Sequence, residues 1–319
     1  MSSEPRKGDP GRPRWWLILN GKSSGDEAVR AAVLARREAG VDLAVRVTWE
    51  GGDAERYVRE AVESGASVVV AAGGDGTLHE VCAALAGYAQ GAEALPAVGL
   101  LPLGTANDFA TAAGVPATPD EALALVAESA ARPIDLLRVQ PLGGEPAWCV
   151  NLATGGFATD ITTDTPPELK RALGAVAYFI TGLAKVGNMR SASGRLYGDD
   201  FTWEGDFLVL GVGNGRQAGG GQALTPDAIL DDGALDLMIL SAPQGDFANV
   251  LGTLIIGGKV AVLDSALRVR LPWVAIETAE SLTLNLDGEP VAGTSFRIDV
   301  VPSRLRMHLP AGCPLLSRP

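Results

Sequence analysis

The sequence has little histidine and little cysteine. Its 319 residues include two histidines, His79 and His308, and three cysteines that are far apart and show no CxxC spacing. Two histidines leave almost no material for a Ser-His-Asp triad or a His-rich metal site, and the cysteine spacing suggests neither a zinc site nor a disulfide framework. Unpaired cysteines suit a reducing compartment, so we expect a cytoplasmic protein.

Long apolar runs and an excess of basic charge are also missing. The longest stretches without Asp, Glu, Lys or Arg are 14 residues, at 94–107 and 146–159, and Gly or Pro interrupts both. A helix that spans a bilayer needs about 20 apolar residues, so no transmembrane segment is expected. The formal charge of −12 argues against a nucleic-acid partner. Basic residues gather only at 1–14, which we expect to be a flexible leader; a lipid-headgroup contact is the alternative.

The first part of the chain alternates short apolar runs with helical patterns. Strands are predicted at 15–19, 41–47, 67–72 and 97–101, and helices begin near Asp26 and Ala54. This order predicts an α/β N-terminal domain over residues 15–140, with a parallel sheet flanked by helices. Ligands of such sheets bind beyond the carboxyl ends of the strands.

The remainder, residues 141–319, reads mainly as strands. Strand-like segments are 148–153, 201–203, 207–212, 235–240, 267–271, 282–286 and 296–301, and helical exceptions are 167–186 and 247–256. We expect a mainly antiparallel β-sandwich domain, with the C-terminal tail packing back on the first domain.

The glycine-rich segment Gly73-Gly74-Asp75-Gly76-Thr77 directly follows a predicted strand and precedes a helix expected near Leu78. Glycines allow close approach of the backbone, and the helix start attracts anions, so the segment predicts a phosphate site. Asp75 suits Mg²⁺ rather than phosphate. A tight turn with Thr77 as helix cap is the alternative. Neither a Walker A loop nor a dinucleotide fingerprint matches, because Trp16 and Arg216 stand where each needs glycine.

Two further segments carry polar groups. The segment 102–109 follows the next predicted strand, so we expect Thr105 to reach a nucleotide and Asp108 to join Asp75 near a metal; a helix cap is the alternative. The turn Leu286-Asp287-Gly288-Glu289 ends a strand with two carboxylates. Glu289 there suits a proton acceptor, and a plain Asp-Gly hairpin is equally compatible.

Three segments resemble the diacylglycerol kinase catalytic family in their sequences and in their order along the chain. They are residues 73–80, 103–108 and 286–289. Residues 47–50, 107–111, 153–157, 213–222 and 313–316 are similar to its YegS-type bacterial lipid kinases, and the resemblance runs from about residue 16 to 316. It implies two domains, with the nucleotide at the cleft between them. One departure is His79, which stands where most relatives carry Asn. Others are the loop 20–25, which only loosely resembles the usual one, and Ala234, where Leu is frequent.

The resemblance implies roles for individual residues. Glu289 is the implied proton acceptor, which Asp287 helps to position. Contacts to ATP are implied for Thr48, Gly74, Asp75, Gly76, Thr77, Leu78, His79, Glu80 and Thr105. A structural divalent cation, Mg²⁺ or Ca²⁺, is implied at the carbonyls of Ile229 and Ala234 and the carboxylate of Asp232; an ordinary acidic turn at 226–233 is the alternative.

The implied activity is ATP-dependent, Mg²⁺-assisted phosphorylation of a hydroxyl on a membrane lipid, such as phosphatidylglycerol or diacylglycerol, within phospholipid biosynthesis. Two alternatives remain open: an NAD-kinase-like enzyme, whose family shares Gly-Gly-Asp-Gly-Thr, and a non-enzymatic nucleotide-sensing module. We expect a monomer or weak homodimer that associates transiently with the membrane surface.

Overall fold

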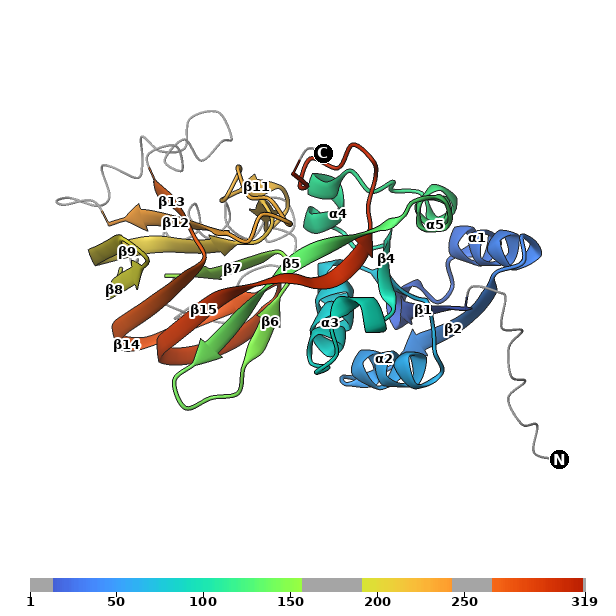
Figure 1. The fold of residues 1–319 in the computed structure, drawn as a ribbon, viewed down its shortest axis with the longest axis horizontal. Helices are drawn as coiled ribbons and strands as arrows, with labels where there is room; N and C mark the ends of the chain where they lie inside the picture. Colours follow the sequence, from blue (N-terminus) through green and yellow to red (C-terminus); the bar gives the residue numbers. More distant parts are fainter. Residues whose placement is uncertain (1–13, 157–190, 243–265, 318–319) are drawn as a thin grey trace. The chain divides into compact units, whose positions relative to one another are not determined.

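A computed structural model describes residues 14–156, 191–242 and 266–317 (Figure 1). Two compact units divide the chain. The first combines Met1–Gly104, Ala113–Ile134 and Ser303–Cys313, and the second combines Thr105–Ala112, Asp135–Pro302 and Pro314–Pro319, each taken over its described residues. The helices expected at 167–186 and 247–256 and nearly all of the leader at 1–14 lie outside the described residues.

The first unit is built on parallel strands. They are β1 (Arg14–Asn20), β2 (Asp42–Thr48), β3 (Val68–Gly73) and β4 (Ala97–Pro102), in the order β4-β3-β1-β2, all parallel. Beyond β4, Met307 of β15 (Glu289–His308) pairs in parallel with Val98. Strands β3 and β4 are buried throughout, as central parallel strands are when both faces are covered.

Helices cover both faces of this sheet. They are α1 (Glu27–Glu38), α2 (Asp53–Glu63), α3 (Asp75–Ala86) and α5 (Pro119–Glu128). Helices α1 and α5 lie together on one face, and α2 and α3 lie together on the other (Figure 1). Val33 of α1 and Val126 of α5 join Leu17 and Val70 of the sheet in one apolar core. The predicted α/β fold of the N-terminal part is confirmed.

The second unit consists mainly of antiparallel strands. They include β5 (Ala131–Pro141, from Asp135 onward), β6 (Ala147–Cys149), β7 (Leu152–Gly155), β8 (Ala192–Gly198), β9 (Phe201–Gly213), β12 (Leu235–Ser241), β13 (Leu267–Leu271), β14 (Trp273–Leu286) and most of β15. The path runs β13-β12-β9-β7-β14-β15, with β8 pairing β9 and β14 and β5 pairing β15 and β6. A small hairpin, β10 (Gln217–Ala218) with β11 (Gln222–Ala223), and α4 (Asp108–Ala113) complete the described elements. The expected antiparallel β-sandwich class is confirmed.

Several predicted boundaries were wrong. Helix α3 begins at Asp75 rather than near Leu78, because the extended Gly74 serves as N-cap and Leu78 N already donates to Gly74 O at 3.1 Å. The strands expected at 201–203 and 207–212 form one strand, β9. The segment expected at 148–153 is interrupted at Val150 and Asn151. Strands β5 and β8 were not predicted.

Candidate active site

The carboxyl ends of β1 and β2 are joined by close backbone contacts. Gly21 follows β1, and its N–H donates to the Thr48 hydroxyl oxygen at 3.3 Å. A Cβ on Gly21 would lie 2.4 Å from the Thr48 carbonyl oxygen, so only glycine fits. Asn20 Nδ2 donates to Thr77 Oγ1 at 3.2 Å and ties β1 to the start of α3. Thr48 and Thr77, both expected near a nucleotide, therefore lie along one edge of the sheet.

The turn between β3 and α3 is tight because it contains glycine. A Cβ on Gly73 would lie 2.2 Å from Thr77 Oγ1, and one on Gly74 would lie 3.1 Å from the Cα of Gly104. Leu103 N donates to Gly73 O at 2.8 Å, so the loops that follow β3 and β4 touch, as their neighbouring strands predict. Gly74 has no side chain to cover the first amide groups of the helix, where an anion binds favourably.

The first turn of α3 divides its residues between core and surface. Gly76 and Glu80 are exposed, Asp75 is half-buried, and the side chains of Thr77, Leu78 and His79 are buried. Leu78 is 1% exposed, so its side chain packs in the core and cannot reach a nucleotide.

Thr105 and Asp108 belong to the second unit. Thr105 is exposed, whereas Asp108 is buried at the start of α4. The Asp108 carboxylate accepts the N–H of Gly220 at 2.9 Å and of Gly221 at 2.6 Å. Both oxygens thus bind the turn of the β10–β11 hairpin, and the expected role of Asp108 near a metal stays a prediction.

The turn after β14 holds two carboxylates in different environments. Asp287 adopts φ 54° and accepts three backbone N–H groups: Val150 at 2.7 Å, Asn151 at 3.1 Å and Leu152 at 2.9 Å. Cys149 Sγ donates to the same carboxylate at 3.4 Å; burial, with Asp287 beside the thiol, raises the pKa of Cys149 well above its ordinary value. Glu289, two residues on, is exposed. Asp287 is thus fixed, while Glu289 is accessible.

The sequence did not reveal the partners of Asp287. Three consecutive amide groups, 150–152, form a concave donor site of the kind that binds anions. The one sequence signal for this donor site is Asn151, a polar residue within an otherwise apolar predicted strand.

The acidic turn at 226–233 carries carboxylates that are already engaged by other groups. Asp232 accepts the Ala234 N–H at 3.0 Å and also contacts Arg270. Asp236 Oδ2 is buried without a hydrogen-bond partner and lies 3.7 Å from Arg270 Nε. Burial raises the pKa of Asp236 to about 6. The nearby Arg270 charge lowers this pKa, and the negative charges of Asp232 and Asp227 raise it further.

This surplus of carboxylate oxygen fits a hard cation such as Mg²⁺ or Ca²⁺. No cluster of three or more His, Cys, Asp or Glu suited to a metal occurs within 14–156, 191–242 and 266–317. The ligand set implied by the family resemblance, the backbone carbonyls of Ile229 and Ala234 with the carboxylate of Asp232, stays a prediction.

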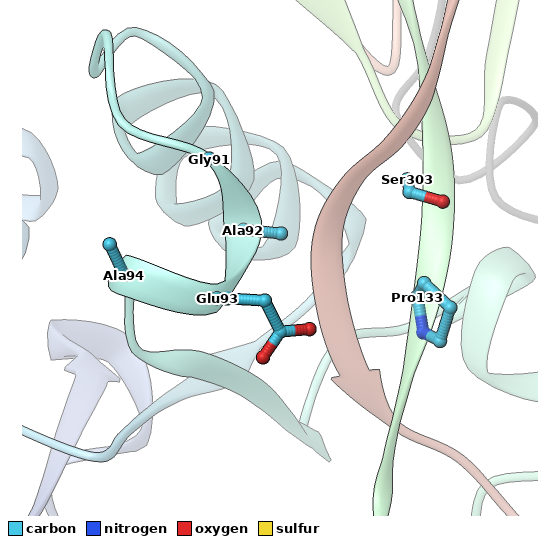
Figure 2. A pocket seen from close by; sticks show the side chains of 6 residues that line it. All are labelled: Gly91, Ala92, Glu93, Ala94, Pro133 and Ser303. Carbon is cyan, nitrogen blue, oxygen red and sulfur yellow. The ribbon is translucent and has the colours of Figure 1, made fainter.

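A pocket of about 380 Å³ lies elsewhere in the first unit (Figure 2). It is lined by Gly91, Ala92, Glu93, Ala94, Pro133 and Ser303. The Glu93 carboxylate lies 3.4 Å from Arg306 and is mostly exposed. The pocket contains none of the residues that the sequence associated with nucleotide, metal or proton transfer.

Comparison with known proteins identifies the class. Residues 14–139 match the diacylglycerol kinase catalytic domain, and residues 157–309 match the YegS C-terminal NAD kinase beta sandwich-like domain. A glycine turn at the edge of an α/β sheet followed by such a β-sandwich defines a two-domain kinase.

Curated relatives identify the family within that class. The chain is 57% identical over 305 residues to "Probable lipid kinase YegS-like" of Xanthomonas oryzae pv. oryzae (strain MAFF 311018), covering 95% of this chain and 98% of the relative. It is 53% identical over 303 residues to the protein of the same name from Pseudomonas aeruginosa strain PAO1, covering 95% and 96%. The chain belongs to the YegS-like lipid kinase family and is an enzyme of the kinase class.

Solved structures agree with this fold. A crystal structure of a diacylglycerol kinase from Bacillus anthracis str. Sterne superposes with a TM-score of 0.71 at 22% identity, covering 95% of this chain and 98% of that one. Among the described residues, no helix has the length and apolar character needed to cross a membrane.

Proposed function

We propose that this kinase transfers the γ-phosphoryl group of ATP to a hydroxyl of a membrane lipid, with Glu289 as general base. The observation that carries the proposal is the contrast within one turn. Asp287 is saturated by backbone donors, whereas Glu289 is exposed on the same rigid segment. A base needs a fixed backbone and an open carboxylate, and the turn supplies both.

The first unit supplies groups for the nucleotide. Backbone amides at the start of α3 suit the phosphates, and Thr48 and Thr77 line the same edge of the sheet. We assign Thr105, His79 and Glu80 to the nucleotide on the resemblance alone. Asp75 is the candidate ligand for Mg²⁺, which would supply positive charge against the phosphates of ATP.

The second unit supplies the base and a candidate structural cation site. Phosphoryl transfer leaves little covalent chemistry to the protein, so catalysis depends on positioning and charge stabilisation. Glu289 takes the hydroxyl proton as the lipid oxygen attacks phosphorus, and ADP leaves. A divalent cation, when bound by Ile229, Asp232 and Ala234, supplies positive charge that offsets the acidic turn.

The proposed acceptor is a primary hydroxyl of phosphatidylglycerol, diacylglycerol or a related lipid. We place the enzyme in the cytoplasm as a monomer or weak homodimer, meeting its lipid transiently at the membrane surface. The names of the curated relatives support a lipid rather than NAD as acceptor.

The test uses purified protein, γ-labelled ATP, Mg²⁺ and vesicles that contain phosphatidylglycerol or diacylglycerol, with NAD as a soluble acceptor in parallel. We expect label in one lipid and none in NAD. Glu289→Gln should lower turnover about 10²- to 10⁴-fold with ATP affinity retained. Glu145→Gln, at an exposed glutamate in the β5–β6 connection, is the matched control and should keep full turnover. Wild-type turnover in Glu289→Gln would remove Glu289 from the mechanism, and label in NAD alone would replace the lipid acceptor.

A further inference from the structure

Asn214 is fully buried just after β9 and bridges two backbone carbonyls. Its Nδ2 donates to Asp135 O at 2.8 Å and to Val150 O at 2.8 Å. Because an amide NH₂ offers two hydrogens from one atom, it can hold two carbonyls at once, which a hydroxyl or a carboxylate cannot do.

The backbone at Asn214 and Gly215 holds Asn151, the residue that follows Val150. The N–H groups of Asn214 and Gly215 donate to Asn151 O at 2.9 and 2.7 Å. Carbonyls 150 and 151 are therefore both fixed from the β9 side. Asn151 Nδ2 also donates to Gln217 O at 2.9 Å. Hydrogen bonds from the Asn151 side chain and to both carbonyls therefore fix Val150 and Asn151, the two residues between β6 and β7.

Each carbonyl shares a planar peptide unit with the next N–H, so the fixed carbonyls 150 and 151 determine where the N–H groups of Asn151 and Leu152 point. N–H groups 150, 151 and 152 converge on the Asp287 carboxylate. Asp287 N in turn donates to Leu152 O at 3.3 Å, and Gly288 N donates to Asn285 Oδ1 at 2.8 Å. The direction in which the chain enters Glu289 thus depends on the conformation of 150–152.

We propose that Asn214 is a positioning residue for Glu289, acting through residues 150–152 and Asp287. This inference rests on the proposed role of Glu289 as base. Loss of the bridge frees the carbonyl of Val150 and with it the N–H of Asn151 in the same peptide unit, so the convergent amides separate and the turn that carries Glu289 samples other orientations. Chemistry slows because a general base must lie within hydrogen-bond reach of its proton.

The test compares Asn214→Ser with Leu237→Ala, a core substitution in β12 that should also lower the unfolding temperature. Asn214→Ala, which removes both side-chain hydrogen bonds without placing a charge in the core, is the second variant in case the serine protein folds poorly. Turnover is expressed per nucleotide-binding site, so that partly unfolded protein does not count. We expect kcat to fall about 10- to 100-fold in the Asn214 variants, with ATP affinity within about twofold of wild type. Leu237→Ala should keep its kcat.

Two readouts distinguish positioning from simple stabilisation. Hydrogen exchange at amides 150–152 and 286–289 should accelerate in Asn214→Ser and not in Leu237→Ala. Combining Asn214→Ser with Asp287→Asn should lower kcat no further than the stronger single change, because both act on one network. Unchanged kcat in the Asn214 variants, or multiplicative losses in the double variant, would overturn the inference while leaving Glu289→Gln to decide the proposed function. Full activity of Glu289→Gln would overturn both.

Discussion

Replacing Asp287 should destabilise the second unit, and alanine should lower its stability by more than asparagine does. The Asp287 oxygens have different partners: Oδ1 accepts the N–H of Asn151 and Leu152, and Oδ2 accepts that of Val150. Asparagine can keep the first two bonds and places an NH₂ group against Val150. Alanine loses all three bonds, and its side chain also tolerates φ 54° poorly.

The magnitudes follow from these contacts. A hydrogen bond contributes about 1 kcal/mol, so alanine loses about 3 kcal/mol, and a left-handed conformation adds about 1 kcal/mol. Asparagine tolerates that conformation and loses about 1–2 kcal/mol. For a unit of this size about 1 kcal/mol lowers the unfolding temperature by about 2–4 °C. We therefore expect decreases of about 8–16 °C for alanine and about 2–8 °C for asparagine.

The assay is thermal unfolding followed by circular dichroism, with Glu289→Ala as the control in the same turn. Glu289 is exposed, so its removal should change the free energy of unfolding by less than about 0.5 kcal/mol. Equal effects of Asp287→Asn and Asp287→Ala, or a decrease as large in Glu289→Ala, would show that the amide contacts do not set the stability of this turn.

Three further predictions concern single residues. Gly73→Ala should weaken nucleotide binding, measured by calorimetry, at least about tenfold, because the new Cβ would lie 2.2 Å from Thr77 Oγ1. Gly91→Ala is the control and should keep its affinity, since nothing lies within 4 Å of the new Cβ. Equal affinities of the two variants would contradict the prediction. Burial lowers the pKa of His308, so its contribution to stability is complete above the unfolded pKa of about 6.5 and is lost as pH falls through the lower folded pKa. Urea midpoints of His308→Gln should accordingly fall less than wild type between pH 7 and 5, and parallel curves would refute the assignment. Burial raises the pKa of Cys149, so iodoacetamide at pH 8 should alkylate it only after unfolding, as peptide mass mapping can check.

The sequence by itself determined the elements that depend on local pattern. Buried runs such as 67–72 and 97–101 predicted β3 and β4 because central parallel strands are apolar on both faces. The glycines at 73 and 74 predicted the turn after β3 because steric demands of the backbone are local. Gly288 likewise marked the turn that carries Glu289.

Only the tertiary structure decided which distant segments meet. Ser303–Cys313 groups with the first unit, where Met307 pairs with Val98 about 200 residues away and Arg304 and Arg306 donate to backbone carbonyls, and no local pattern encodes these contacts. The same holds for Asp108 with Gly220, and for Asn214 with Asp135 and Val150. These contacts satisfy buried backbone groups, and every residue except proline carries the same backbone N–H and C=O, so the sequence does not reveal which of them a side chain will bind.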